Sequence, residues 1–215
     1  MTRIQDASAG GAGPLTKVLL RLSRRKLRQM TGRAPEGMLG PLEAYARLPR
    51  LLVGYGMFED ATARLHGVPE RLKALAELKA ATLTSCEYCI DIGSQLGRRA
   101  GLSDAELLAL ASYRESELFD DLDMLVLDYA VAMSRTPVEV SDRLFGQLRE
   151  ALDESQLVEL THVIALENMR GRFNLGLGYG AAGFCEGMVC ALPEHPTNVE
   201  APAPALDGAG TQVPA

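Results

Sequence analysis

The 215-residue chain carries 22 Lys and Arg residues against 28 Asp and Glu residues, a formal net charge of −6. With 47% hydrophobic and 23% charged residues it can bury a core, and its acidic balance argues against general nucleic-acid binding. No apolar run reaches about 18 residues, and the first residues lack a basic segment followed by an apolar one. We therefore expect neither a membrane span nor a secretory signal.

Apolar residues recur at helical spacing along most of the chain, whereas runs that alternate as in a half-buried strand are almost absent. We therefore predict an all-α fold. Residues 1–13 are rich in glycine and residues 193–215 hold five prolines, so we expect disordered ends around one helical domain at 14–192. Two of the expected helices begin at residues 14 and 103, and the others cover residues 42–46, 49–65, 69–83, 86–100, 125–134, 140–151 and 156–177.

Two of these helices carry a capping signal at their start. Ser103 is followed three residues later by Glu106, which is the pattern of a capping box. Asp153 or Ser155 is expected to cap the long helix near the C-terminal end.

Cys86 and Cys89 stand two residues apart in the stretch TSCEYCIDIG, at the start of a predicted helix. A thiol pair at this spacing can close a disulfide or share a metal. In the first helical turn, Cys89 would lie near backbone N–H groups that lack a partner within the helix, which favours its thiolate. Cys86 could then attack a sulfenic acid on Cys89. We predict a redox-active pair, with buried structural cysteines and a metal site as alternatives.

Cys185 and Cys190 are the other two cysteines of the chain. A metal site at the first pair would need two more ligands, and the spacing of this second pair does not indicate a zinc ribbon. We therefore expect no metal and no cofactor. Cys185 and Cys190 are interpreted as structural cysteines, which could pair with each other or serve as a thiol partner.

The first cysteine pair lies within a longer pattern over residues 71–107, with CEYCID at 86–91 and RRAGLS at 98–103, followed by ALENMRGRFN at 165–174. This combination resembles the carboxymuconolactone decarboxylase / alkylhydroperoxidase D-like family over much of the chain. The resemblance implies an AhpD-like helical bundle that assembles as a homotrimer or homohexamer.

In redox-active members of that family the second cysteine attacks a hydroperoxide and the first resolves the product. The resemblance therefore implies that Cys89 and Cys86 are catalytic, that the substrate is a small hydroperoxide, and that an unknown thiol supplies electrons. Those members also carry a His four residues after the second cysteine and a Glu twelve residues before the first, which relay a proton. This chain has Gly93 and Ala74 there, so the usual relay is absent.

Two residues are candidate replacements for that relay. Glu77 lies among alanines on the helix that leads into the cysteines, where burial would raise its pKa; a solvent-facing Glu77 is the alternative. His162 lies among apolar residues of the long helix and is either a displaced base or a hydrogen-bonded core residue. Asn168 and Arg172 share a helix face and could bind an anionic substrate or form hydrogen bonds across the core.

These observations together predict thiol-dependent reduction of hydroperoxides in the cytoplasm. One alternative is a non-catalytic or regulatory member of the same fold. Another is a cofactor-free decarboxylase or isomerase, although decarboxylating members of the family generally lack the cysteine pair that this chain retains.

Overall fold

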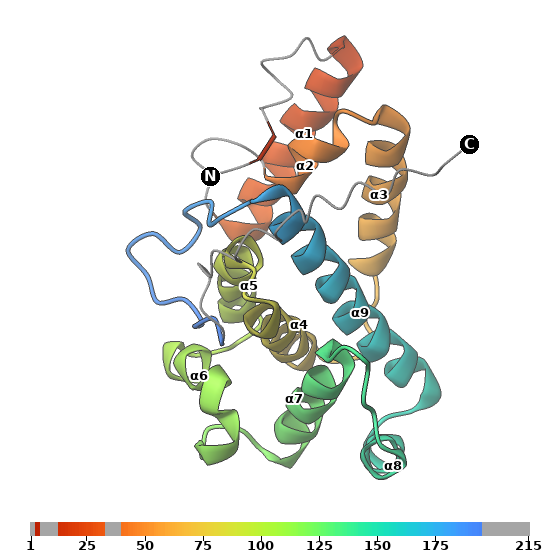
Figure 1. Cartoon of the computed structure of the whole chain (residues 1–215), viewed down its shortest axis with the longest axis vertical. Coiled ribbons are helices and arrows are strands. Elements are labelled where there is room, and N and C mark those ends of the chain that lie inside the picture. Colours follow the sequence, from red (N-terminus) through yellow and green to blue (C-terminus); the bar gives the residue numbers. More distant parts are fainter. Residues whose placement is uncertain (1–2, 5–12, 33–39, 195–215) are drawn as a thin grey trace, which may run out of the picture.

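The computed structural model describes residues 3–4, 13–32 and 40–194, so the ends predicted to be disordered lie almost entirely outside the described residues. Over the described ranges the chain forms helices and no strand, which confirms the predicted all-α fold (Figure 1). The elements are α1 (Pro14–Thr31), α2 (Pro41–Tyr45), α3 (Pro49–Thr62), α4 (Glu70–Thr84), α5 (Glu87–Arg99), α6 (Asp104–Ala109), a 3₁₀ helix η1 (Leu110–Glu115), α7 (Asp121–Ser134), α8 (Asp142–Ala151) and α9 (Glu154–Leu177).

Side chains at the helix starts fix several of these boundaries. Ser103 forms the predicted capping box with Glu106. Asp153, one of the two predicted caps of the long helix, forms a capping box with Gln156. Helix α7 begins earlier than the apolar pattern predicted, because the Asp120 side chain accepts a hydrogen bond from the backbone N–H of residue 123.

Helix α4 is the central element, with α5 on one side and α7 and α9 on the other (Figure 1). Its Ala76 and Ala80 are fully buried in a cluster that includes Val126 of α7 and Ile164 of α9. These small side chains let the three helices approach closely. Leu75 of α4 belongs instead to a second cluster with α5 and η1.

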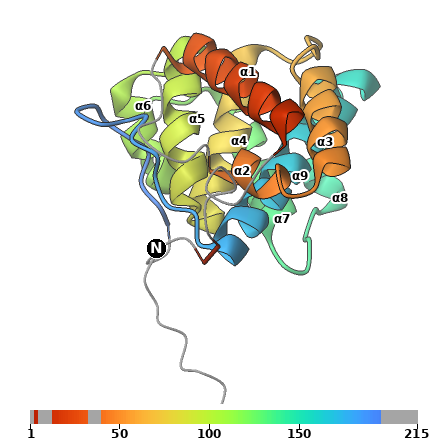
Figure 2. The same ribbon diagram turned by 90° about the horizontal axis from the view of Figure 1, so that it is seen from above.

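Helices α1, α2 and α3 form a layer over one end of this core, with α1 lying across it when seen from above (Figure 2). The layer is joined to α9 by stacked aromatic rings: Tyr45 stacks on Tyr55 at 4.3 Å and on Phe173 at 4.6 Å between ring centroids. This arrangement encloses space between the layer and the core helices.

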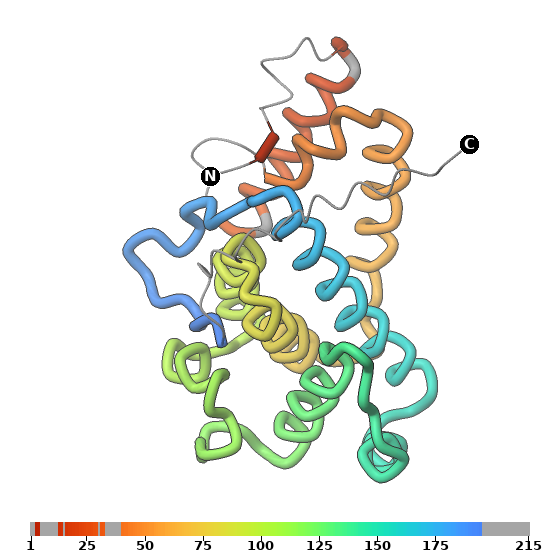
Figure 3. The backbone as a smooth tube through the Cα atoms, in the orientation of Figure 1, coloured from red at the N-terminus to blue at the C-terminus, as the bar shows by residue number. Residues whose placement is uncertain are grey.

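The segment that follows α9 turns back and runs beside α5 (Figure 3). Asp91 of α5 anchors it, because its buried carboxylate accepts hydrogen bonds from the backbone N–H groups of Ala182, Phe184 and Cys185. Cys185 forms a disulfide with Cys190 in the same segment. None of the described helices has the length and apolar character needed to cross a membrane.

Candidate active site

The turn between α4 and α5 positions the first cysteine pair. Ser85 ends α4 in the left-handed conformation, with φ of 53°, and Cys86 then takes the N-cap position of α5. Cys89 lies in the first turn, but its backbone N–H donates to the sulfur of Cys86, at 3.3 Å. The backbone donor that we expected to favour a thiolate on Cys89 is therefore directed at Cys86.

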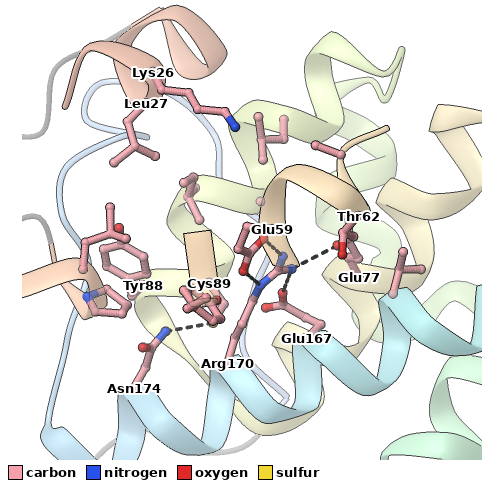
Figure 4. Close-up of a pocket in the computed structure, with 18 of the residues that line it drawn as sticks. Lys26, Leu27, Glu59, Thr62, Glu77, Tyr88, Cys89, Glu167, Arg170 and Asn174 are labelled. Atoms are coloured by element: carbon pink, nitrogen blue, oxygen red, sulfur yellow. Dashed lines mark hydrogen bonds and ion pairs between the residues drawn. The ribbon is translucent and has the colours of Figure 1, made fainter. Parts of the chain in front are cut away.

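Cys86 and Cys89 form a disulfide, and the two sulfurs differ in their access to solvent. Cys86 is completely buried, whereas Cys89 is 5% exposed and lines a cavity of about 720 Å³. The amide Nδ2 of Asn174, on α9, lies 3.3 Å from Cys89 Sγ and 3.5 Å from Cys86 Sγ (Figure 4). A molecule in the cavity therefore meets Cys89 first, with Cys86 behind it.

The cavity lies between the α1–α3 layer and helices α4, α5 and α9, and most of its wall is apolar. The apolar and aromatic lining residues include Leu22, Leu27, Leu42, Tyr45, Tyr55, Leu78, Tyr88, Ile92, Leu96, Val163 and Phe173. A largely apolar chamber of this size with a few convergent polar groups is typical of a site for a small organic molecule.

The polar groups gather around Arg170 of α9 (Figure 4). Its guanidinium donates to Glu59 of α3 at 3.0 Å, to Glu77 of α4 at 3.1 Å and to Glu167 of α9 at 3.1 Å. Burial alone would lower the pKa of Arg170, but the three carboxylates outweigh it and raise that pKa well above its usual value. One cation thus faces three acidic groups drawn from three helices.

Burial raises the pKa of two carboxyl groups of this cluster, Glu167 and Glu77. Burial raises the pKa of Glu167 to about 7 despite the neighbouring Arg170. Burial also raises the pKa of Glu77. Because Glu167 can both hold and release a proton near neutral pH, the cluster can act as a general acid or base on a molecule in the cavity.

This pKa predicts how the stability of the protein depends on pH. A carboxyl whose pKa is raised by folding binds its proton more tightly in the folded chain, so the free energy of unfolding should fall as pH rises from about 4.5 to about 7. A Glu167→Gln variant should lose this dependence, which amounts to at most about 3 kcal/mol. Urea unfolding between pH 5 and pH 8 measures it, with Glu150→Gln on the exposed face of α8 as the control. Parallel pH curves for wild type and Glu167→Gln would contradict the assignment.

The other predicted site residues lie apart from the cavity lining. His162 lies 2.9 Å from Thr62 Oγ1 through its Nε2 and packs edge-on against Phe58. Asn168 donates to Ser134 Oγ at 2.9 Å and to a backbone carbonyl of its own helix. Arg172 donates to Asn168 and to Thr136 on the α7 side. Glu77 therefore lines the cavity with Cys89, whereas His162, Asn168 and Arg172 do not.

Four residues that line the cavity were not identified as candidates from the sequence: Asn174, Arg170, Glu59 and Glu167. One signal was present, since Glu167 and Arg170 are three residues apart on the long helix. Opposite charges at this spacing lie on the same helix face and can form an ion pair. Nothing in the spacing could have joined Glu59 to them.

One group of potential metal ligands is present among the described residues: Asp91, Cys185 and Cys190. The Asp91 carboxylate already accepts three backbone hydrogen bonds, and the sulfurs of Cys185 and Cys190 are joined in a disulfide. These groups serve to hold the segment after α9 against α5.

Comparison with known proteins identifies the family. The chain is 35% identical over 177 residues to the uncharacterized protein YnjA of Escherichia coli (strain K12), covering 81% of this chain and 96% of YnjA. Residues 48–131 match the carboxymuconolactone decarboxylase family. The chain belongs to the carboxymuconolactone decarboxylase family. A weaker similarity, 24% over 111 residues, relates it to the uncharacterized protein YdfG of Bacillus subtilis (strain 168), covering 51% of this chain and 76% of YdfG.

Solved structures show the same fold. A variant of the debrominase Bmp8 in complex with 2,3,4-tribromopyrrole has a TM-score of 0.66 at 20% identity, covering 85% of this chain and 91% of that one. A peroxidase-related protein from Silicibacter sp. TM1040 gives 0.65 at 18% identity, covering 82% and 90%. ATU0492 from Agrobacterium tumefaciens, a protein of unknown function that has been described as an AhpD-type antioxidant defence protein, gives 0.54 at 19% identity, covering 84% and 98%. The expected AhpD-like helical bundle is thus confirmed.

Ala74 and Gly93, where the resemblance led us to expect a Glu and a His, both line the cavity, together with Leu78. A Cβ atom on Gly93 would lie 3.0 Å from the Leu78 side chain, so Leu78 fills the space that a side chain at residue 93 would need. Two carboxyl groups with a raised pKa, those of Glu77 and Glu167, line the same cavity.

Proposed function

We propose that the protein reduces organic hydroperoxides through the Cys86–Cys89 pair. The observation that carries the proposal is the position of Cys89, which lines the 720 Å³ cavity with Cys86 bonded directly behind it. An attacking thiol at a cavity wall with a resolving thiol at bonding distance is the minimum that a two-cysteine peroxidase requires.

The reaction balances with the two thiols and one external reductant. The Cys89 thiolate attacks the outer oxygen of the hydroperoxide, the O–O bond breaks, and the alkoxide leaves as an alcohol after taking a proton. Cys86 then attacks the sulfur of the resulting sulfenic acid on Cys89, forming the disulfide and releasing water. An external dithiol reduces the disulfide with two electrons and returns the two protons.

The carboxyl cluster supplies the proton that the alkoxide needs. Glu167, with a pKa of about 7, and Glu77, whose pKa is also raised, line the same cavity as Cys89. These two residues would replace the usual proton relay, whose positions are occupied here by Ala74 and Gly93.

The expected homo-oligomer belongs to the same proposal. Apolar side chains on α1 and α3 are exposed and would be covered by a second copy, among them Val18, Leu22, Met57 and Phe58.

The test is a thiol count. The Cys185→Ser/Cys190→Ser chain keeps Cys86 and Cys89 and has two thiols after reduction. It is mixed with one equivalent of cumene hydroperoxide. We expect one equivalent of peroxide to disappear and both thiols to be lost, faster than with the same concentration of dithiothreitol. Two thiols that persist beside unconsumed peroxide would refute the proposal.

The carboxyl cluster also favours a second candidate, cofactor-free proton transfer at a carbon activated by a carbonyl group, as in decarboxylation or isomerisation. Glu167 has the pKa of a general base and lies in a cavity that can hold such a molecule. This candidate needs neither sulfur, so activity would survive Cys89→Ser and would be lost in Glu167→Gln. The two candidates therefore make opposite predictions for Cys89→Ser, which should abolish peroxide reduction and leave proton transfer intact.

A further inference from the structure

Asn174 of helix α9 contacts both sulfurs of the cysteine pair at the start of α5. It is 1% exposed and lies in the last turns of α9. Its approach depends on Gly171 one turn earlier, where a Cβ atom would lie 2.7 Å from Thr84 Oγ1 at the end of α4. The missing side chain at residue 171 thus lets α9 come close enough for Asn174 to reach the sulfurs.

The contacts of Asn174 differ for its two amide atoms. Its Nδ2 carries two hydrogens and lies within 3.3 Å of Cys89 Sγ and 3.5 Å of Cys86 Sγ. Among the described residues, Asn174 is the hydrogen-bond donor to Cys89 Sγ, since the backbone N–H of the first turn is directed at Cys86. Its Oδ1 is buried without a hydrogen-bond partner.

That unpaired oxygen indicates that Asn174 does not serve stability. A buried amide that satisfies only its nitrogen carries the desolvation cost of its oxygen, and an apolar side chain of the same shape would avoid it. An unsatisfied buried polar group in direct contact with reactive atoms is typical of a functional residue.

We infer that Asn174 is a catalytic residue that stabilises the thiolate of Cys89 and then that of Cys86. This inference rests on the proposed peroxidase function. A hydrogen bond to a charged sulfur is stronger than one to a neutral thiol, so the Asn174 amide favours loss of the proton from Cys89. Because the same amide reaches both sulfurs, it can follow the negative charge from Cys89, when it attacks the peroxide, to Cys86, when it resolves the sulfenic acid.

The experiment measures the acidity of Cys89 without any peroxide. Reduced protein in the Cys185→Ser/Cys190→Ser background is alkylated with iodoacetamide between pH 5 and pH 10, and peptide mass spectrometry follows modification at Cys89. Asn174→Leu is expected to raise the thiol pKa by about one unit, which slows alkylation at pH 7 about tenfold. Asn174→Asp is expected to raise it further, since a carboxylate beside the sulfur opposes the thiolate.

Two measurements separate this role from a structural one. Asn174→Leu should unfold in urea at the same concentration as wild type or a higher one, whereas a structural residue would lower it. Leu175→Ala, at an exposed neighbouring position on α9, should leave the Cys89 alkylation profile unchanged. If Asn174→Leu does not fold, the isosteric Asn174→Asp variant carries the test alone.

The outcomes distinguish this inference from the proposed function. Alkylation profiles of the Asn174 variants that coincide with the wild-type profile would overturn the inference, whatever the protein does with peroxides. A raised Cys89 pKa in those variants, together with a wild-type protein that consumes no cumene hydroperoxide, would support the role of Asn174 and refute the peroxidase.

Discussion

A Cys89→Ser chain is expected to leave cumene hydroperoxide untouched, while a Cys86→Ser chain should consume one equivalent and stop. The difference follows from access to the cavity. Cys89 lines the cavity and Cys86 is fully buried behind it, so removal of Cys89 leaves no sulfur that a peroxide can reach. Removal of Cys86 leaves the attack intact and takes away the second step.

The product of that single turnover is the measurement. Cys86→Ser treated with one equivalent of peroxide should hold a sulfenic acid on Cys89, which dimedone traps as an adduct of defined mass. The Cys185→Ser/Cys190→Ser chain is the control, because this disulfide lies outside the cavity lining and its loss should leave turnover at the wild-type rate. Steady turnover by Cys89→Ser, or an adduct on Cys86, would show that the two roles are assigned to the wrong sulfurs.

The largest expected loss of stability is that of Arg170→Leu, at most about 3–5 kcal/mol in the free energy of unfolding at pH 8, since the Arg170 side chain is 22% exposed and that of Glu77 32%. Arg170 is the shared partner of Glu59, Glu77 and Glu167, and its removal leaves three acidic groups facing one another. Removing one member of a buried charge cluster costs more than the cluster contributes, since the remaining charges stay desolvated.

The pH dependence identifies the cause of this loss. The pKa of Glu167 and that of Glu77 are raised by burial even with Arg170 present, and both should rise further without it. Acids with a raised pKa stabilise the fold when protonated, so the Arg170→Leu chain should regain stability as pH falls from 8 to 5. Urea unfolding at both values measures it, with Arg149→Leu on the exposed side of α8 as the control. An equal loss at pH 5 and pH 8 would point to lost packing of the arginine side chain instead.

The helices could be predicted from the sequence because their signals are local. The capping signals at Ser103 and Asp153 are local in the sequence, and both residues cap their helices. The early start of α7 was missed because acidic residues surround its first apolar position, Leu122, and one of them, Asp120, is a cap and not part of a loop. Local chemistry was sufficient there too, once the aspartate is interpreted as a capping residue.

The candidate site could be predicted only in part, for reasons of distance along the chain. The cysteine pair is a local motif, and Glu77 lies on the helix that leads into it. The Arg170 cluster joins residues 111 and 93 positions apart, a proximity that only the packing of α3, α4 and α9 creates. Asn174 was overlooked for the same reason, because its contact with the sulfurs depends on how closely α9 crosses the end of α4.

The burial of Cys86 also restricts the reductive half of the proposed cycle. A reductant would have to attack Cys89 from the cavity and expel Cys86 as the leaving thiolate, because Cys86 is completely buried. Oxidant and reductant would then bind in the same cavity, so each would exclude the other while it is bound. A narrow dithiol, or an extended loop with an exposed cysteine, would fit this route better than a protein partner with a flat surface.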